Sequence, residues 1–140
     1  MNNRFKFRVW DKITNQYLQE LGIYYWHIPY SLDGEEITGE ANLVGLSELL
    51  KHDNFVTQQY TGLNDSNDNP IYEGDILMYK SGSIPTTGVI GQVLYEADEG
   101  GYIFQWKRKG RNQDYNNLNC DLAFESVIVG NIFEHSELLK

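Results

Sequence analysis

The stretch Tyr60-Thr-Gly-Leu-Asn-Asp-Ser-Asn-Asp-Asn-Pro-Ile-Tyr-Glu-Gly-Asp-Ile76 decides the fold of this chain, because it predicts a strand end, a polar turn and the start of a second strand. Gly62 can take the positive φ that a chain reversal needs. The six polar residues at 64–69 favour turns made by hydrogen bonds between side chains and backbone. Pro70 disfavours helical geometry at the residue before it. The stretch therefore predicts a corner between two strands.

Two glycines and two aspartates of this stretch are expected to shape its turns. A Gly-Asp pair that leads into a strand is common at the corners of small barrels. Glu73 and Asp75 lie two residues apart and so share one face of a strand, and paired carboxylates can do acid–base chemistry when one of them is buried. Aspartates beside glycines more often accept backbone N–H bonds, so we favour structural roles. The four turn residues are Gly62, Asp65, Gly74 and Asp75.

Other candidate sites of chemistry are weak. The run Asp65-Ser-Asn-Asp-Asn69 is similar to a calcium loop, but the EF-hand pattern needs glycine at its sixth position and glutamate at its twelfth, where this chain has Pro70 and Ile76. The three histidines are scattered and lack the spacing of a zinc site. Cys120 has no basic residue near it in the sequence, which predicts a buried, inert thiol. We expect no catalytic residue, no metal and no cofactor.

Three segments in order along the chain point to one family. They are the opening Lys6-Phe-Arg-Val-Trp-Asp11, the central Gln59-Tyr-Thr-Gly-Leu63 with Asp65 and Ile71-Tyr-Glu-Gly-Asp-Ile76, and the closing Val127-Ile-Val-Gly-Asn-Ile-Phe-Glu134 with Ser136-Glu-Leu-Leu139. Together they resemble the YopX family of phage and prophage proteins, and they bracket nearly the whole chain. The resemblance implies a phage or prophage protein, and it brings no established biochemical activity with it.

Length and composition predict one cytoplasmic domain over residues 1–140. A chain of 140 residues is of single-domain size, and its aromatic share of 14% favours strands over helices. The single cysteine cannot form an internal disulfide, which fits a reducing compartment. No apolar run approaches the roughly 20 residues of a membrane span, and the first residues do not have the pattern of a signal peptide. We therefore expect the protein in the host cell cytoplasm.

The net charge of −9 is unevenly distributed along the chain. Residues 1–30 carry four basic and two acidic residues, which leaves seven basic against eighteen acidic residues in the remainder. An acidic body opposes non-specific binding to nucleic acid, because that attraction comes mostly from Lys and Arg.

Periodicity predicts a mainly-β fold with an N-terminal hairpin. Apolar and basic residues alternate over 4–10, which predicts a half-buried strand; a turn at 11–15 and a return strand at 16–20 complete the hairpin. Gly22 to Tyr30 is a third extended run, ended or placed at an edge by Pro29. Leucines at roughly helical spacing over 43–50 predict one short helix.

The later part of the chain predicts a small barrel. Short runs recur about every 8–12 residues, as in β-sandwiches and barrels. Residues 112–119 are polar and expected to be irregular, and 121–134 are expected to form a long strand bent at Gly130. We predict a partly open, SH3-like β-barrel over about residues 71–134, with the N-terminal hairpin and the short helix as additions. That topology is an analogy and does not fix a function.

Two groups of basic residues are candidate interaction surfaces: Arg4, Lys6 and Arg8 in the first strand, and Lys107, Arg108, Lys109 and Arg111 in one cluster. The first group could pair with an acidic face of another subunit or of a partner, since opposite patches steer association. The second follows three alternating aromatic residues, an arrangement that can bind single-stranded nucleic acid. The alternative is that these aromatics face the core and the cluster is a solvated hairpin end.

These observations favour a phage-derived interaction or assembly module that is not an enzyme and forms homo-oligomers. Small β proteins with free edges often hide them by assembly. One alternative is an acidic regulator that occupies the cationic surface of a host nucleic-acid-binding protein. A second is a weak nucleic-acid binder through residues 107–111, whose affinity would fall steeply with salt. A third is an unrecognised enzyme, which a cleft of strongly perturbed polar groups would indicate.

Overall fold

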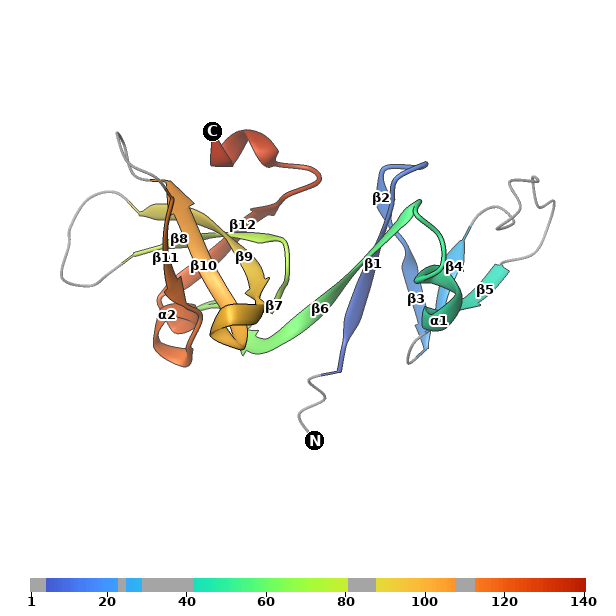
Figure 1. The fold of residues 1–140 in the computed structure, drawn as a ribbon, viewed down its shortest axis with the longest axis horizontal. Helices are drawn as coiled ribbons and strands as arrows, with labels where there is room; N and C mark the ends of the chain where they lie inside the picture. The colour runs from blue at the N-terminus through green and yellow to red at the C-terminus, as the bar shows by residue number, and fades with distance from the viewer. Residues whose placement is uncertain (1–4, 23–24, 29–41, 81–87, 108–112) are drawn as a thin grey trace. The chain divides into compact units, whose positions relative to one another are not determined.

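The computed structural model describes residues 5–22, 25–28, 42–80, 88–107 and 113–140, and within these ranges the fold is mainly β (Figure 1). The chain divides into two compact units, one over Phe5–Gln59 and one over Tyr60–Lys140. Strand β6 (Phe55–Asn64) begins in the first unit and ends in the second. The single domain expected from the length of the chain stays a prediction.

The first unit is built on a hairpin and a three-stranded sheet. β1 pairs with β2 across the turn at 12–15 and with the first half of β6, while β3, β4 and β5 form the second sheet. Asp11 closes the hairpin turn, because its buried carboxylate accepts hydrogen bonds from Ile13 N–H and Thr14 Oγ1–H, both at 2.9 Å. The elements are β1 (Phe7–Asp11), β2 (Gln16–Tyr17), β3 (Gln19–Gly22), β4 (Tyr25–Ile28), β5 (Asn42–Gly45) and α1 (Leu46–Leu49).

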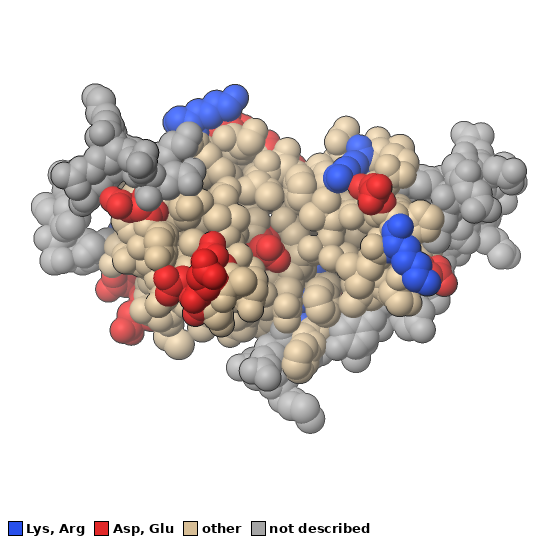
Figure 2. All heavy atoms as spheres, in the orientation of Figure 1, with Lys and Arg blue, Asp and Glu red and all other residues tan. Residues whose placement is uncertain are grey.

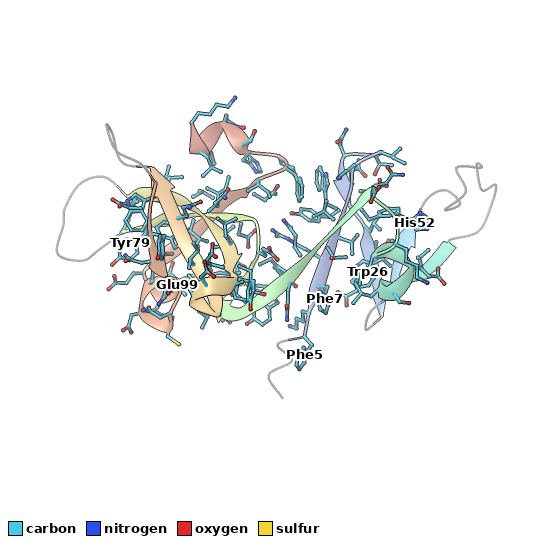
Figure 3. The ribbon with its side chains drawn as sticks, viewed as in Figure 1. Phe5, Phe7, Trp26, His52, Tyr79 and Glu99 are labelled. Atoms are coloured by element: carbon cyan, nitrogen blue, oxygen red, sulfur yellow. The ribbon has the colours of Figure 1, made fainter. Side chains whose placement is uncertain are left out.

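The hydrophobic core of the first unit is formed by apolar side chains of its strands and of α1. Alternation places Phe7 and Val9 of β1 on the buried side, where Phe7 packs against a cluster that includes Trp26 (Figure 3). The buried members of the cluster are Val9, Trp26, Ile28, Val44, Leu49 and Phe55.

The second unit is built on one five-stranded antiparallel sheet, in the order β11-β10-β9-β8-β12, which curls into a half-barrel. Its core is a cluster of six buried residues: Ile71, Leu77, Val93, Phe104, Leu122 and Ala123. The elements are β7 (Pro70–Tyr72), β8 (Asp75–Tyr79), β9 (Val89–Glu96), η1 (Ala97–Glu99), β10 (Gly101–Lys107), β11 (Gln113–Asn117), α2 (Cys120–Phe124), β12 (Ser126–Asn131) and η2 (Ser136–Leu139).

The predicted mainly-β fold with a partly open barrel is confirmed, but three local predictions are wrong. The helix expected over 43–50 is shorter, because 42–45 form β5, which pairs with β4. The segment 112–119 is not irregular, since residues 113–117 pair with β10 as β11. The strand expected from 121 begins at Ser126, after a second short helix, α2. The irregularity expected near Gly130 is present, as the register of β12 shifts between Ile128 and Gly130.

Among the residues that the structure describes, no helix is long and apolar enough to cross a membrane.

Candidate functional site

Asp65 organises the turn between β6 and β7. Its side chain is buried, and its Oδ1 accepts hydrogen bonds from the N–H groups of Asn67 at 3.0 Å and Asn69 at 2.9 Å. Its Oδ2 accepts from Ile128 N–H of β12 at 3.0 Å. The backbone also closes the turn, because Asp65 N–H donates to Asn69 O at 2.9 Å. One carboxylate therefore holds a turn together and ties it to a distant strand.

The same turn covers one edge of the five-stranded sheet. β12 pairs with β8 on one side. On its other side, Ser126 O accepts from Ser66 N–H at 2.9 Å, and Ile128 N–H donates to Asp65. The outer backbone groups of an edge strand are a template for pairing with another chain. Two of those groups on β12 are satisfied by the turn, so we name this side of the sheet the capped edge.

A second turn joins β7 to β8 around Gly74 and Asp75. The buried Asp75 Oδ2 accepts from Tyr72 N–H at 2.8 Å. Gly74 has a φ of 86°, a region that L-residues other than glycine enter only at a cost. Its N–H donates to Val93 O at 2.8 Å, and its carbonyl accepts from Ile132 N–H at 2.9 Å. This corner thus connects the turn to β9 and to the residue after β12.

Gly62 and Tyr60 shape the end of β6. Gly62 has a φ of 88°, and the register of β6 with β7 shifts between Tyr60 and Asn64. The buried Tyr60 donates its hydroxyl to Asn64 Oδ1 at 2.6 Å. Burial, and to a smaller extent the charge of Asp68, raises the pKa of the Tyr60 hydroxyl above its ordinary value. The four turn residues expected from the sequence therefore lie at corners that the backbone and buried carboxylates define.

The carboxylates of these turns face N–H donors. Both oxygens of Asp65 and the Oδ2 of Asp75 accept backbone hydrogen bonds, as a turn-forming aspartate does. In the described ranges no group of three or more His, Cys, Asp and Glu side chains could hold a metal ion. His135 Nδ1 accepts from Asn131 N–H at 3.2 Å, and His52 packs edge-on against Phe55.

Cys120 is exposed at the start of α2, so the prediction of a buried thiol is wrong. The reason lies in the helix cap. Asn119 Oδ1 accepts from Leu122 N–H at 2.9 Å and starts α2, and the helix then turns Leu122 and Ala123 into the core while Cys120 faces solvent.

β11 forms the opposite edge of the sheet. In the described part of the chain, β10 is its only strand neighbour. Leu118 N–H donates to Tyr102 O of β10 at 3.0 Å. In an antiparallel pair, residues that hydrogen-bond to the partner alternate with residues whose backbone groups point away. By this alternation Asn116 faces β10, whereas the N–H and C=O groups of Tyr115 and Asn117 point outward. We name this side of β11 the open edge; sequence analysis missed it.

Acidic groups gather around the open edge. Tyr115 is 49% exposed, and its hydroxyl donates to Glu99 Oε1 of η1 at 2.8 Å. That hydrogen bond, with the charge of Glu99 and of the nearby Glu96 and Asp98, raises the pKa of the Tyr115 hydroxyl. Figure 2 shows acidic side chains gathered over η1, and Figure 3 labels Glu99 on that element.

A polar pocket of about 280 Å³ lies beside the C-terminal half of β11. Asp121 lies on α2, Glu125 is the residue that caps the end of this helix, and both line the pocket. Tyr79 of β8 (Figure 3) contributes a ring to the wall. We name this the β11 pocket; its lining residues are Tyr79, Asn116, Asn117, Asn119, Asp121, Leu122 and Glu125.

The two basic groups predicted from the sequence are described only in part. Arg8 is already engaged, because its Nε donates to Gln58 Oε1 at 2.8 Å and its guanidinium lies 4.7 Å from the centre of the Tyr17 ring. Lys6 is exposed. Lys107 ends β10, and Arg4, Arg108, Lys109 and Arg111 lie outside the described residues.

The aromatic residues before the second basic group pack inward. Phe104 is buried, and Tyr102 and Trp106 pack against the same core cluster. Phe104 and Trp106 are stacked with ring centres 5.5 Å apart. These rings therefore fill the half-barrel, which agrees with the alternative that they face the core.

Comparison with known proteins gives a family and solved structures that are similar to this chain. The family model described as YopX protein matches residues 6–140. The crystal structure of protein EF1440 from Enterococcus faecalis is similar, with a TM-score of 0.57 and 23% sequence identity over 96% of this chain and 97% of that chain. At this identity the likeness shows the fold alone. None of the curated proteins compared with the chain matches it significantly.

Proposed function

This chain belongs to the YopX family, and we propose that it is a phage- or prophage-derived interaction module that works through its surface in the host cytoplasm and is not an enzyme. The observation that carries the proposal is the use of the buried carboxylates. Asp11, Asp65 and Asp75 are at most 4% exposed, and each accepts hydrogen bonds from its own turn.

These hydrogen bonds distinguish the three buried aspartates from catalytic residues. A general acid or base must reach the proton that it transfers on a substrate. A buried carboxylate aimed at backbone N–H groups stabilises a fold and leaves recognition to the exposed residues. The acidic bias of the chain beyond residue 30 gives those exposed residues a common sign, which favours partners of opposite charge.

We also propose that the module associates with itself through its basic N-terminal strip, Arg4, Lys6 and Arg8, and an acidic face of another copy. Opposite charges on two copies would raise the association rate and make it sensitive to salt. Gln58 and Tyr17 engage Arg8, and Lys6 is exposed, so we choose Lys6 for the test.

Light scattering at several salt concentrations tests this association. We expect a mass above that of one chain at low salt, and a lower mass at high salt. Lys6→Glu should lower the mass at low salt more than Lys12→Glu, a matched change at an exposed turn residue. A strict monomer at low salt would contradict self-association.

A further inference from the structure

We propose that the open edge of β11 is a docking site for an extended, cationic segment of a partner protein, which pairs with β11 as a sixth strand of the sheet. The inference rests on the proposed function as an interaction module and names the surface and the chemistry of its partner. Main-chain hydrogen bonds supply affinity in this mode of recognition, and pockets for alternate side chains supply specificity.

The backbone of β11 is arranged for strand addition. Tyr115 and Asn117 point their N–H and C=O groups away from β10, as the Leu118–Tyr102 hydrogen bond and the ladder register require. Side chains leave this edge accessible, since Tyr115, Asn116 and Asn117 are all exposed. The capped edge shows the contrast, because there the chain itself supplies Asp65 and Ser66 to the outer groups of β12.

The charge around the open edge identifies the occupant. On one side of β11 lies the β11 pocket, whose acidic lining residues are Asp121 and Glu125. The backbone N–H of Lys80 donates to Glu125 O at 3.2 Å, but Lys80 does not line the pocket. The other side presents Tyr115 with Glu99. Carboxylates thus lie on both sides of β11, whereas the basic residues Lys107, Arg108, Lys109 and Arg111 precede the strand in the sequence.

This arrangement predicts two consecutive basic residues in the incoming segment. Successive side chains of a strand point to opposite faces of the sheet. One long cationic side chain can then enter the β11 pocket toward Asp121 and Glu125, and its neighbour can reach Glu99 on the opposite face. A second copy of β11 is a poorer occupant, because two-fold pairing would bring the same carboxylates of both copies together, and like charges repel.

Calorimetric titration of the full chain with short peptides tests the proposal. The probe is acetyl-Thr-Val-Arg-Lys-Val-Thr-amide, and its control replaces the Arg-Lys pair by Glu-Asp. Two further peptides carry N-methyl groups on alternate residues, one on the odd and one on the even positions. Strand pairing uses only every second N–H of the peptide, so one N-methylated peptide should bind at least about tenfold more weakly than the other. The Glu-Asp peptide should not bind.

Protein variants locate the binding. Asp121→Asn with Glu125→Gln should weaken the Arg-Lys peptide about tenfold, because it removes both charges of the β11 pocket. The matched control, Asp53→Asn at an exposed residue that does not line the pocket, should leave the affinity within about twofold, since solvent screens exposed charges that do not contact the peptide. Equal loss in both variants would indicate non-specific charge attraction and overturn the proposal.

Three other results would overturn it as well. They are the absence of binding by the Arg-Lys peptide, equal binding of the two N-methylated peptides, and slow hydrogen exchange of the outward β11 amides that becomes fast on dilution. The last result would make a second copy the occupant. The mass measurement described above is independent of peptide binding. A chain that self-associates but binds no peptide therefore refutes this inference and leaves the interaction module standing.

Discussion

The two edges of the five-stranded sheet differ in what meets their outer backbone groups. At the capped edge, Ser126 and Ile128 of β12 are bonded by Ser66 and Asp65 of the β6–β7 turn. At the open edge, β11 has β10 as its one strand neighbour in the described ranges, and Tyr115 and Asn117 direct their backbone outward. Both edges belong to the same half-barrel, so their difference comes from the segments around them.

The difference shows which edge of the sheet the chain covers with its own residues and which edge it leaves accessible. Free edges invite pairing with other chains, and proteins usually cover them. Here the β6–β7 turn, with Asp65 at its centre, covers one edge. The open edge is instead flanked by carboxylates, which repel a second acidic chain and attract a cationic one.

The largest effect is expected at the capped edge. Asp65→Ala removes the acceptor of three backbone N–H groups, and Ile128 N–H would lose its partner at the sheet edge. We expect the free energy of unfolding to fall by about 3–4 kcal/mol, measured by urea denaturation. Asp65→Asn keeps one acceptor oxygen and should lose about half as much. If Asp65→Ala cost less than about 1 kcal/mol, the turn would not be what closes this edge.

A proline scan of β11 separates its two sides. Asn116→Pro removes an N–H that faces β10, so we expect a loss of about 2–3 kcal/mol in unfolding free energy. Asn117→Pro removes an outward N–H and should cost less than about 1 kcal/mol, because proline is tolerated on the solvent side of an edge strand. Thermal unfolding of both variants checks the order. Equal losses would show that the open edge is not open.

The corner at Gly74 is expected to give a smaller effect. Gly74→Ala places a side chain at a φ of 86°, which costs about 1–2 kcal/mol of unfolding free energy. Gly101→Ala is the matched control, because a Cβ there meets nothing within 4 Å and the backbone φ is not positive. The control should stay within about 0.5 kcal/mol of the parent. Similar denaturation midpoints for the two variants would contradict a special role of the corner.

Much of this comparison can be predicted from the sequence, and part of it cannot. The turn residues Gly62, Asp65, Gly74 and Asp75 have local signatures, since glycine tolerates positive φ and aspartate accepts N–H bonds nearby. The bond from Ile128 to Asp65 joins residues 63 positions apart, and no local pattern specifies it. The mainly-β fold could be predicted from the alternation of apolar and polar residues, because this pattern can be recognised without knowing which strands pair.

The open edge was not predicted, because β11 forms a strand through its pairing with β10 and not through a strong strand preference of its own residues. The sequence Gln113-Asp-Tyr-Asn-Asn117 has low intrinsic strand preference, and pairing with β10 supplies what local preference lacks. In α2, Leu122 and Ala123 belong to an apolar run that also fits a strand. The hydrogen bond from Leu122 N–H to the Asn119 side chain caps the start of α2 and favours the helix. In the first unit, the leucine spacing over 43–50 fits a helix, but pairing with β4 makes 42–45 a strand.

The smallest effect concerns ionisation beside the open edge. The hydrogen bond from Tyr115 to Glu99 is the main reason that the Tyr115 pKa is raised. A raised pKa favours the protonated hydroxyl in the folded state, so this contribution to stability is present below the unfolded pKa of about 10 and is lost as pH rises through the folded pKa.

Absorbance of tyrosinate during alkaline titration measures this effect, with Tyr115→Phe identifying the signal. Glu99→Gln should shift the Tyr115 transition to lower pH, whereas Glu134→Gln, at another exposed glutamate, should not move it. An unchanged transition in Glu99→Gln would remove Glu99 from the surface assigned to the open edge.

Backbone amide hydrogen exchange compares the two edges most directly. We predict slow exchange for Ile128 and Ser66 at the capped edge, fast exchange for Tyr115 and Asn117 at the open edge, and slow exchange for these last two once the Arg-Lys peptide is added. Slow exchange of Tyr115 and Asn117 in the free monomer, or fast exchange of Ile128, would contradict the assignment of one closed and one accessible edge.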